Sequence, residues 1–352
     1  MEKFSQFRDR GSGISPFLPV TTPSSLPATA FHAVLFLLRL PFFLCLTTAY
    51  FLVLQHLPLP AVARKLLLWL QLAIPGVWWV DLQLDGVKRG SLSQQPRSRV
   101  PHPGSVIAAN FTSPVDALYL AAVFDPIFVA CHPTSRKVRR ISLLAAILAA
   151  LSPAAQLLPA SAREWEHQQQ QQQQQQQAAA SDLTTLAALQ ARHPGRVIAL
   201  FPECGTTNGR GVLPASAALL GAARGAPVFP VSLRYAPPDV ATPVPGWRAA
   251  AAFLWKLLGR PTHCVRVRIA EAVFNTAGAA NGVSEEAAAP AVAAETRAGG
   301  GDGDGGDDAL TAEEQRLLDR VAEALARLGR AKRVGLTLQD KKAFVAAWTK
   351  KR

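Results

Sequence analysis

The sequence is poor in several residue types, and each shortage narrows the class of protein. Charged residues make up 17% of the 352 residues, whereas an ordinary soluble domain carries about 25%. The four cysteines (Cys45, Cys131, Cys204 and Cys264) form no CxxC pair, so neither a zinc site nor a disulfide framework is indicated. Acidic residues are also few, since 24 Asp and Glu stand against 37 Lys and Arg, a net charge of +13. With 49% hydrophobic residues, the chain as a whole is not disordered, and it fits a membrane-associated protein with a cytosolic face.

The N-terminal region divides into two parts. Residues 1–30 are rich in Ser, Pro, Thr and Gly and lack a sustained hydrophobic period, which predicts a flexible tail without a secretory signal. Residues 31–80 contain two uncharged runs, Leu40–Gln55 and Leu66–Val80, of sixteen and fifteen residues. A helix that spans a bilayer needs roughly 20 apolar residues, so each run is short for a straight crossing. We therefore expect 31–80 to be a membrane-attached helical segment.

Two arrangements of this segment stay open. A single span requires the first run to extend past Arg39, whose side chain would snorkel to the lipid surface. A hairpin would instead turn near Pro58 and Pro60. Three tryptophans are expected at the membrane interface in either case: Trp69, Trp78 and Trp79.

The rest of the chain divides by composition. Residues 81–278 are expected to form an α/β domain, in which the uncharged run Ile141–Ala162 predicts a buried helix plus loop. Within this domain the glutamine tract 168–177 predicts a disordered insert. An acidic, Gly-rich linker is expected at 279–308. Its repeated D-G-D pattern could suggest a calcium-binding loop, but the later glutamate of an EF-hand is missing. C-terminal helices are predicted in 309–352, the first of them after a capping box of Thr311 and Glu314.

Three apolar segments in the central domain predict buried strands: 105–109, 196–201 and 226–234. Strands that alternate with helices indicate an α/β fold with a mostly parallel sheet flanked by helices. Polar residues follow the first two strands, as Asn110-Phe-Thr-Ser-Pro-Val-Asp116 and as Pro202-Glu-Cys-Gly-Thr-Thr-Asn-Gly-Arg-Gly211. Because the carboxyl ends of parallel strands meet at one edge of a sheet, these residues are expected to form a site.

The second polar stretch has what an anionic substrate requires. Gly205 and Gly209 allow close backbone approach, the threonines and amides donate hydrogen bonds, and Arg210 can bind a phosphate with two hydrogen bonds. The simpler interpretation is an ordinary Gly-rich turn. The stretch is not a Walker loop, because no Lys-Ser/Thr follows the glycines.

FPECGTTNGR resembles the F-P-E-G-T signature of the glycerol-phosphate and lysophospholipid acyltransferases. NFTSPVD lies upstream, where that family has N-H-x4-D, and VFPVSLR matches the family's fourth, proline-containing block. The resemblance covers roughly Val80 to Glu271. The order of the blocks and the apolar N-terminal region look most like the fungal lysophosphatidic acid acyltransferase branch that uses oleoyl-CoA.

The resemblance implies an acyltransferase that moves a fatty acyl group from acyl-CoA to lysophosphatidic acid or a related lysophospholipid. Acyl-CoA would be a co-substrate, with no further cofactor and no metal. Membrane lipid is the other expected partner, and the endoplasmic reticulum or a lipid droplet, with the domain facing the cytosol, is the implied location. Asp116 is the implied catalytic residue. The implied substrate-binding residues are Asn110, Glu203, Gly205, Thr206, Thr207, Asn208, Gly209 and Arg210. The family's second block, which carries an arginine for the phosphate, is poorly kept, and Arg163 is its nearest candidate by position.

Two departures from the family pattern leave alternatives open. Phe111 stands where the family has its general-base histidine, and Phe cannot accept a proton. Cys204 displaces the glycine after Glu203. Another base (Asp116, His102 or His132) could act, or the Cys204 thiol could form an acyl-enzyme. The remaining alternative is an inactive lipid-binding or membrane-trafficking protein.

The basic cluster Arg136–Arg140 is expected to meet CoA phosphates or anionic headgroups, unless it is only a solvated helix start. Nucleic acid is not an expected partner. The basic residues are scattered among apolar runs, and the sequence carries no helix-turn-helix, zinc or RNA-binding signature.

Overall fold

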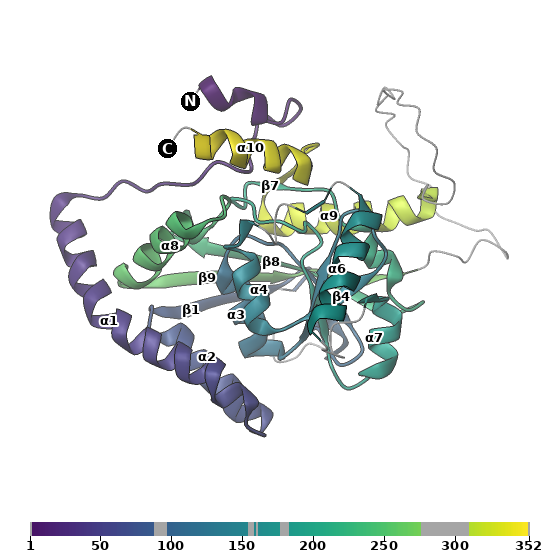
Figure 1. Cartoon of the computed structure of the whole chain (residues 1–352), viewed down its shortest axis with the longest axis horizontal. Helices are drawn as coiled ribbons and strands as arrows, with labels where there is room; N and C mark the ends of the chain where they lie inside the picture. The colour runs from purple at the N-terminus through teal and green to yellow at the C-terminus, as the bar shows by residue number, and fades with distance from the viewer. Residues whose placement is uncertain are drawn as a thin grey trace.

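The computed structural model describes residues 2–87, 97–153, 158–159, 161–176, 183–275 and 310–350. At its centre is a nine-stranded sheet with the order β1-β9-β8-β2-β6-β3-β4-β5 and with β10 paired to β8, while β11 and β7 form a separate small sheet (Figure 1). The strands are β1 (Val77–Leu84), β2 (Val106–Ala109), β3 (Ile127–Cys131), β4 (Val138–Ile141), β5 (Leu183–Thr184), β6 (Ile198–Leu200), β7 (Gly211–Val212), β8 (Pro227–Ala236), β9 (His263–Ile269), β10 (Val273–Phe274) and β11 (Lys332–Arg333).

The helices surround this sheet. The α-helices are α1 (Leu26–Leu52), α2 (Ala61–Ala73), α3 (Pro114–Phe124), α4 (Leu143–Ala149), α6 (Ala162–Gln176), α7 (Leu186–Arg192), α8 (Trp247–Gly259), α9 (Ala312–Gly329) and α10 (Leu338–Lys350). The short 3₁₀ helices are η1 (Glu2–Phe7), η2 (Leu54–His56), η4 (Arg97–Arg99), η5 (Ala217–Gly221) and η6 (Pro238–Val240).

The middle of the sheet is parallel, as the sequence predicts. Strands β8, β2, β6 and β3 are parallel neighbours, whereas β9 pairs with β8, and β4 with β3, in antiparallel fashion. The three predicted strands correspond to β2, β6 and β8. The predicted α/β fold is therefore confirmed.

Alternate residues of β2 enter two different cores. Ile107 and Ala109 pack with α2, α3, α4 and α8 on one face of the sheet. Val106 and Ala108 pack with α7, η5 and α9 on the other face. With both faces covered, these strands are buried on both sides, which explains their continuous apolar sequence.

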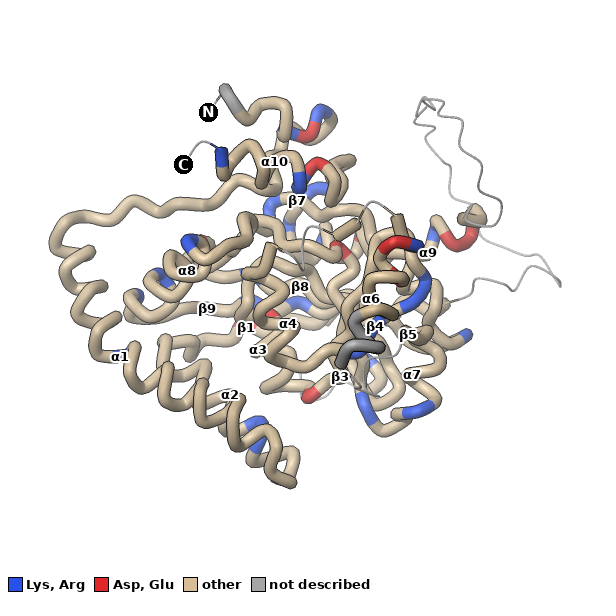
Figure 2. Tube along the Cα trace, viewed as in Figure 1, with Lys and Arg blue, Asp and Glu red and all other residues tan. Residues whose placement is uncertain are grey.

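Helices α1 and α2 form a hairpin that extends from one edge of the domain (Figure 1). The chain turns between Leu52 and Ala61, where the prolines predict it. Residues Leu26–His56 are long and apolar enough to cross a membrane, and they are the one such stretch within the described ranges. Figure 2 shows little charge along both helices. We call the following exposed side chains the α1–α2 apolar surface: Phe31, Val34, Leu37, Leu38, Phe42, Leu44, Leu52, Val62, Leu66 and Leu70.

Several details of this region differ from the prediction. Arg39 does not snorkel, because its guanidinium donates to the carbonyls of Leu258 (3.3 Å) and Pro261 (3.0 Å) and so ties the middle of α1 to the domain. Trp69 is partly buried and packs edge-on against Tyr119, at 6.1 Å between ring centroids, so its place at a membrane interface stays a prediction. Residues 77–80 belong to β1 rather than to the helical segment, although Trp78 and Trp79 are more than 70% exposed, as interface residues would be.

The prediction of a flexible tail at 1–30 is wrong. Phe4, Phe7 and Phe17 are buried and surround Phe344 of α10, with ring centroids 5.5, 5.3 and 6.0 Å away. These aromatic residues lack helical or strand periodicity, which is why the sequence pattern does not reveal them. The N- and C-terminal segments consequently lie side by side (Figure 1).

The remaining predicted segments have mixed outcomes. The glutamine tract is helical as far as Gln176, because it continues α6 from the buried Trp165 and glutamine is a good helix former. Gln177 and the acidic linker 279–308 lie outside the described residues. The run 141–162 contains a helix of only seven residues, α4, with Ala146 buried. The capping box that opens α9 is confirmed.

Candidate functional site

The loop after β6 is anchored by the buried carboxylate of Glu203. Its Oε1 accepts from the Phe111 amide (3.4 Å) and its Oε2 from the Leu213 amide (3.1 Å). Burial raises the pKa of Glu203 to about 8, although these two amides and the nearby Lys341 charge lower it. Glu203 therefore connects its own loop with the turn after β2.

Asp116 anchors the other side of that turn. Its Oδ2 accepts from the amides of Thr112 (2.7 Å) and Ser113 (2.8 Å), and the Tyr235 hydroxyl of β8 donates to its Oδ1. Asp116 is thus the acidic member of the capping box that opens α3. Burial raises its pKa to about 6, although these donors lower it.

The structure brings the two predicted carboxylates together. They accept from consecutive amides, those of Phe111 and Thr112, and so hold the turn from both sides. Both carboxyl groups are buried, at 2% exposure for Glu203 and 0% for Asp116. Their visible role is to position the turn. Asp116 as the catalytic residue stays a prediction.

Phe111 faces a cavity of about 780 Å³, which we call the Phe111 cavity. Its ring stacks on Phe201, with centroids 4.2 Å apart and planes 17° from parallel. The cavity runs from the ends of β3, β4 and β6 to α4 and α6, and its wall is mostly apolar. Among its lining residues are Phe111, Cys131, Arg139, Ile141, Leu148, Trp165, Phe201, Cys204 and Lys342.

The polar groups of the predicted substrate loop mainly hold the loop in place. The Asn110 amide group donates to the Leu233 carbonyl (2.9 Å) and accepts from the Leu233 amide (2.7 Å), which fixes the end of β2 to β8. The Thr206 hydroxyl donates to the Thr242 carbonyl (2.6 Å), and the Thr207 amide donates to the Phe111 carbonyl (2.9 Å).

Both chain ends cover this loop. Asn208 donates to the carbonyls of Ser15 (2.8 Å) and Leu18 (3.0 Å) in the N-terminal segment. Gly205 lies so close to Leu338 of α10 that an added Cβ would be 2.6 Å from the leucine Cδ2. Gly209, at φ +73°, makes the turn where only glycine is unstrained.

Lys341 of α10 is a site residue that the sequence reasoning missed. Its fully buried ammonium donates to the Thr206 carbonyl (2.6 Å) and hydroxyl (3.1 Å). Burial lowers its pKa to about 7, although the Glu203 charge raises it. One signal could have revealed it, because Lys341 shares helical spacing with the apolar Phe344, Val345 and Trp348.

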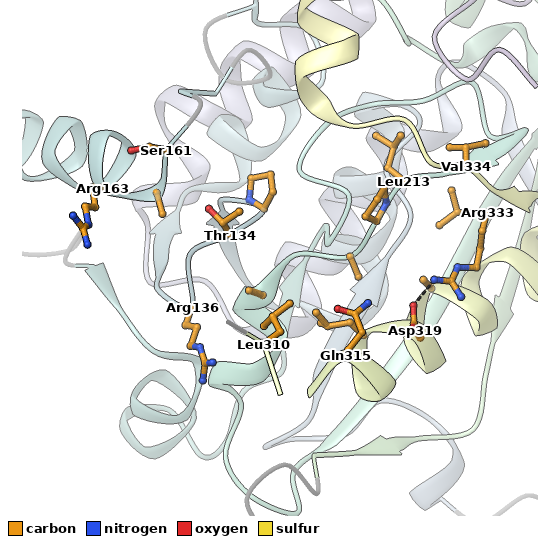
Figure 3. Close-up of a pocket in the computed structure, with 18 residues that line it drawn as sticks. Thr134, Arg136, Ser161, Arg163, Leu213, Leu310, Gln315, Asp319, Arg333 and Val334 are labelled. Carbon is orange, nitrogen blue, oxygen red and sulfur yellow. Dashed lines mark hydrogen bonds and ion pairs between the residues drawn. The ribbon is translucent and has the colours of Figure 1, made fainter. Parts of the chain in front are cut away.

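The predicted arginines lie elsewhere. Arg210 is exposed. Arg163 lines a second cavity, of about 540 Å³, in which Figure 3 shows Arg136 and Arg163 on one side and Arg333 with Asp319 on the other. Arg136 is paired there with Glu314 (2.8 Å). Of the basic cluster 136–140, it is Arg139 that lines the Phe111 cavity.

The alternative histidine bases are bound to other groups. His132 is within hydrogen-bond distance of the Pro159 carbonyl (3.0 Å) and the Thr134 hydroxyl (3.1 Å), and burial lowers its pKa. His102 contacts the Val100 carbonyl (3.1 Å). Neither lines the Phe111 cavity, as far as its described residues go.

Cys204 occupies the backbone position that the signature gives to glycine. Its φ is +53°, in the left-handed region that glycine prefers. Its Sγ lies 3.1 Å from the Sγ of Cys131, the last residue of β3.

The fold therefore has the mostly parallel sheet flanked by helices that the sequence predicts for an acyltransferase-like domain. Over 252 residues the chain is 29% identical to the curated Schizosaccharomyces pombe protein "Putative lysophosphatidic acid:oleoyl-CoA acyltransferase". The match covers 70% of this chain and 77% of that protein. No family model matches the chain, and no solved structure matches it. The similarity supports the predicted relationship to the acyltransferase family.

Proposed function

We propose that the protein transfers a fatty acyl group from acyl-CoA to lysophosphatidic acid or a related lysophospholipid. The observation that carries this proposal is the Phe111 cavity, a largely apolar space whose wall includes residues of both motif turns. The name of the fission yeast relative, which specifies lysophosphatidic acid and oleoyl-CoA, supports the choice of substrates.

In this proposal the acyl chain lies in the Phe111 cavity against the stacked rings of Phe111 and Phe201. Arg139 supplies positive charge in the same cavity and would bind the phosphate of the acceptor. The buried carboxyl groups of Glu203 and Asp116 hold the two turns in place through hydrogen bonds to backbone amides. Holding both reactants in place can lower a barrier by several kcal/mol.

The second cavity suits the phosphates of CoA. Three arginines line it, Arg136, Arg163 and Arg333, and two of them are paired with Glu314 and Asp319 (Figure 3). Acyl-CoA is a co-substrate in this proposal. The arginines would exchange part of their carboxylate contacts for phosphate oxygens on binding.

We place the α1–α2 apolar surface in the cytosolic leaflet of the endoplasmic reticulum or of a lipid droplet. The Arg39 contacts hold the middle of α1 against the domain, which favours a hairpin in the plane of the membrane over a crossing. The exposed Trp78 and Trp79 are suited to the headgroup region.

One observation favours a second function, lipid binding without turnover. Phe111 replaces the proton acceptor of the family, and its ring is packed against Phe201. An inactive protein of this kind would bind oleoyl-CoA or the lysolipid but form no product. Activity that appears only in Phe111→His would favour this second function.

Two leucines of α4 give a matched test. Leu148 lines the Phe111 cavity and Leu144 does not, and both are partly exposed, at 49% and 36%. With labelled oleoyl-CoA and lysophosphatidic acid, the wild type should form phosphatidic acid. Leu148→Trp should lower the rate at least tenfold and Leu144→Trp less than twofold. Absence of product from the well-folded wild type would refute the proposed activity.

A further inference from the structure

Two of the four cysteines meet in the wall of the Phe111 cavity. Cys131 ends β3, and Cys204 follows Glu203 in the loop after β6, 73 positions later in the chain. Their Sγ atoms are 3.1 Å apart, and both residues line the cavity. A disulfide has an S–S bond of about 2.05 Å, so roughly 1 Å of approach would join them.

We propose that Cys131 and Cys204 are a reversible dithiol–disulfide site, which low-molecular-weight disulfides such as oxidised glutathione reach through the Phe111 cavity. Cys204 is partly exposed and Cys131 is buried, so Cys204 is the first to react. The inference concerns the chemistry of the two thiols and does not depend on the proposed acyl transfer.

The reaction runs in two exchange steps. The Cys204 thiolate attacks one sulfur of oxidised glutathione, forming a mixed disulfide and releasing one glutathione thiolate, which takes up a proton. The Cys131 thiolate then attacks the Cys204 sulfur and releases the second glutathione. In sum, two protein thiols become one disulfide and one oxidised glutathione becomes two reduced ones.

Two features of the surroundings favour the second step. The sulfurs are already neighbours in the folded chain, so the attack by Cys131 is intramolecular and has a high effective concentration. Their contacts with carbonyl groups are long: the Cys131 thiol lies 3.4 Å from the Phe201 carbonyl and the Cys204 thiol 3.5 Å from the Pro202 carbonyl. Cys204 also has a hydrogen bond with the Ser216 side chain. The disulfide would tie the loop that carries Glu203 to the end of β3.

The reaction should be slow at neutral pH. Burial, and then the neighbouring Cys131, raise the pKa of Cys204 well above its usual value, and only the thiolate attacks. The rate of crosslinking should therefore rise steeply between about pH 7 and pH 9, in the direction expected for thiolate attack.

Trypsin separates the two cysteines and makes the test direct. Cleavage after arginine puts Cys131 in the peptide 100–136 and Cys204 in the peptide 197–210, each with a single cysteine. The reduced full-length protein is treated with oxidised glutathione, alkylated and digested without reductant. The expected product is the disulfide-linked pair of these peptides, which disappears when dithiothreitol is added.

Variants separate this result from general thiol oxidation. Cys131→Ser should leave glutathione on Cys204, and Cys264→Ser should leave the crosslink unchanged. A glycine is also expected to fit at position 204, so Cys204→Gly should fold and yield no crosslink. If the folded wild type carried glutathione on Cys204 without the crosslink, or if neither thiol reacted while Cys45 did, the inference would be overturned.

Discussion

At the scale of single residues, the site depends on ionisable groups that are fully buried. Glu203, Asp116 and Lys341 are each at most 2% exposed, and each binds backbone groups of the motif turns. The sequence motifs predicted that both acidic residues belong to the site. Their partners Phe111, Thr112 and Ser113 lie within the quoted motif letters. Their partners Leu213 and Tyr235 lie outside those letters and could not be predicted, and neither could Lys341, which donates to Thr206.

Replacing Glu203 should have an effect that depends on pH. In the native state burial raises the pKa of Glu203 from 4.5 to about 8. Between these values the unfolded chain has lost a proton that the folded chain keeps, so this group makes the wild type less stable as pH rises. Glu203→Gln leaves one of the two backbone amides that Glu203 binds without an acceptor. Near pH 5 this should lower the free energy of unfolding by about 1–3 kcal/mol.

The difference in the free energy of unfolding between the wild type and Glu203→Gln should shrink toward pH 8. At that pH the folded wild type must either ionise the buried Glu203 or keep a proton that the unfolded chain has released. Urea unfolding at several pH values measures this difference, with Glu313→Gln, on the exposed side of α9, as the control for loss of one carboxylate. A gap between wild type and Glu203→Gln that widens with pH would contradict the assignment.

At the scale of elements, the strands could be predicted and the packing of the C-terminal helix could not. β2, β6 and β8 are apolar runs bounded by polar turns, so local pattern alone identifies them. α10 covers Gly205 through Leu338 and Lys341, contacts that join residues more than 130 positions apart. No local pattern contains such information, and the buried aromatic residues near the N-terminus escaped prediction for the same reason.

The contact of α10 with the motif loop can be tested by comparing neighbouring lysines. Lys341→Met removes the donor to the Thr206 carbonyl, so the free energy of unfolding should fall by about 1–3 kcal/mol. Lys342→Met, at an exposed position, should change it by less than about 0.5 kcal/mol. Urea unfolding of both variants near pH 6, where Lys341 is protonated, makes the comparison. Equal effects would show that the Lys341 contact contributes nothing to stability.

At the scale of the whole molecule, charge and apolar surface are separated. α1 and α2 carry few charges and expose many large apolar side chains, whereas the α/β domain carries most of the basic residues (Figure 2). The uncharged runs of the sequence predicted these apolar helices. The sequence did not predict the position of Arg39, because the carbonyls that accept from it belong to segments around residues 75 and 260.

Charged substitutions on the α1–α2 apolar surface should weaken binding to lipid. Phe42 and Leu66 are 68% and 63% exposed, and burying such a side chain is worth about 1.5–3 kcal/mol. Phe42→Glu and Leu66→Glu should each lower the affinity of the protein for lipid vesicles at least tenfold. The affinity is measured by flotation with vesicles that contain anionic lipid. Leu310→Glu, at an exposed leucine before α9, is the control. Unchanged flotation of both variants would contradict a membrane role for this surface.

The central claim is that an acyl chain lies in the Phe111 cavity, beside the two motif turns. A photoreactive oleoyl-CoA analogue with a diazirine on its acyl chain tests this directly when the labelled peptides are mapped by mass spectrometry. The account predicts labels on the lining of the cavity, in the tryptic peptides 100–136 and 197–210, and competition by unmodified oleoyl-CoA. Labels confined to α1 and α2, with none on either peptide, would contradict it.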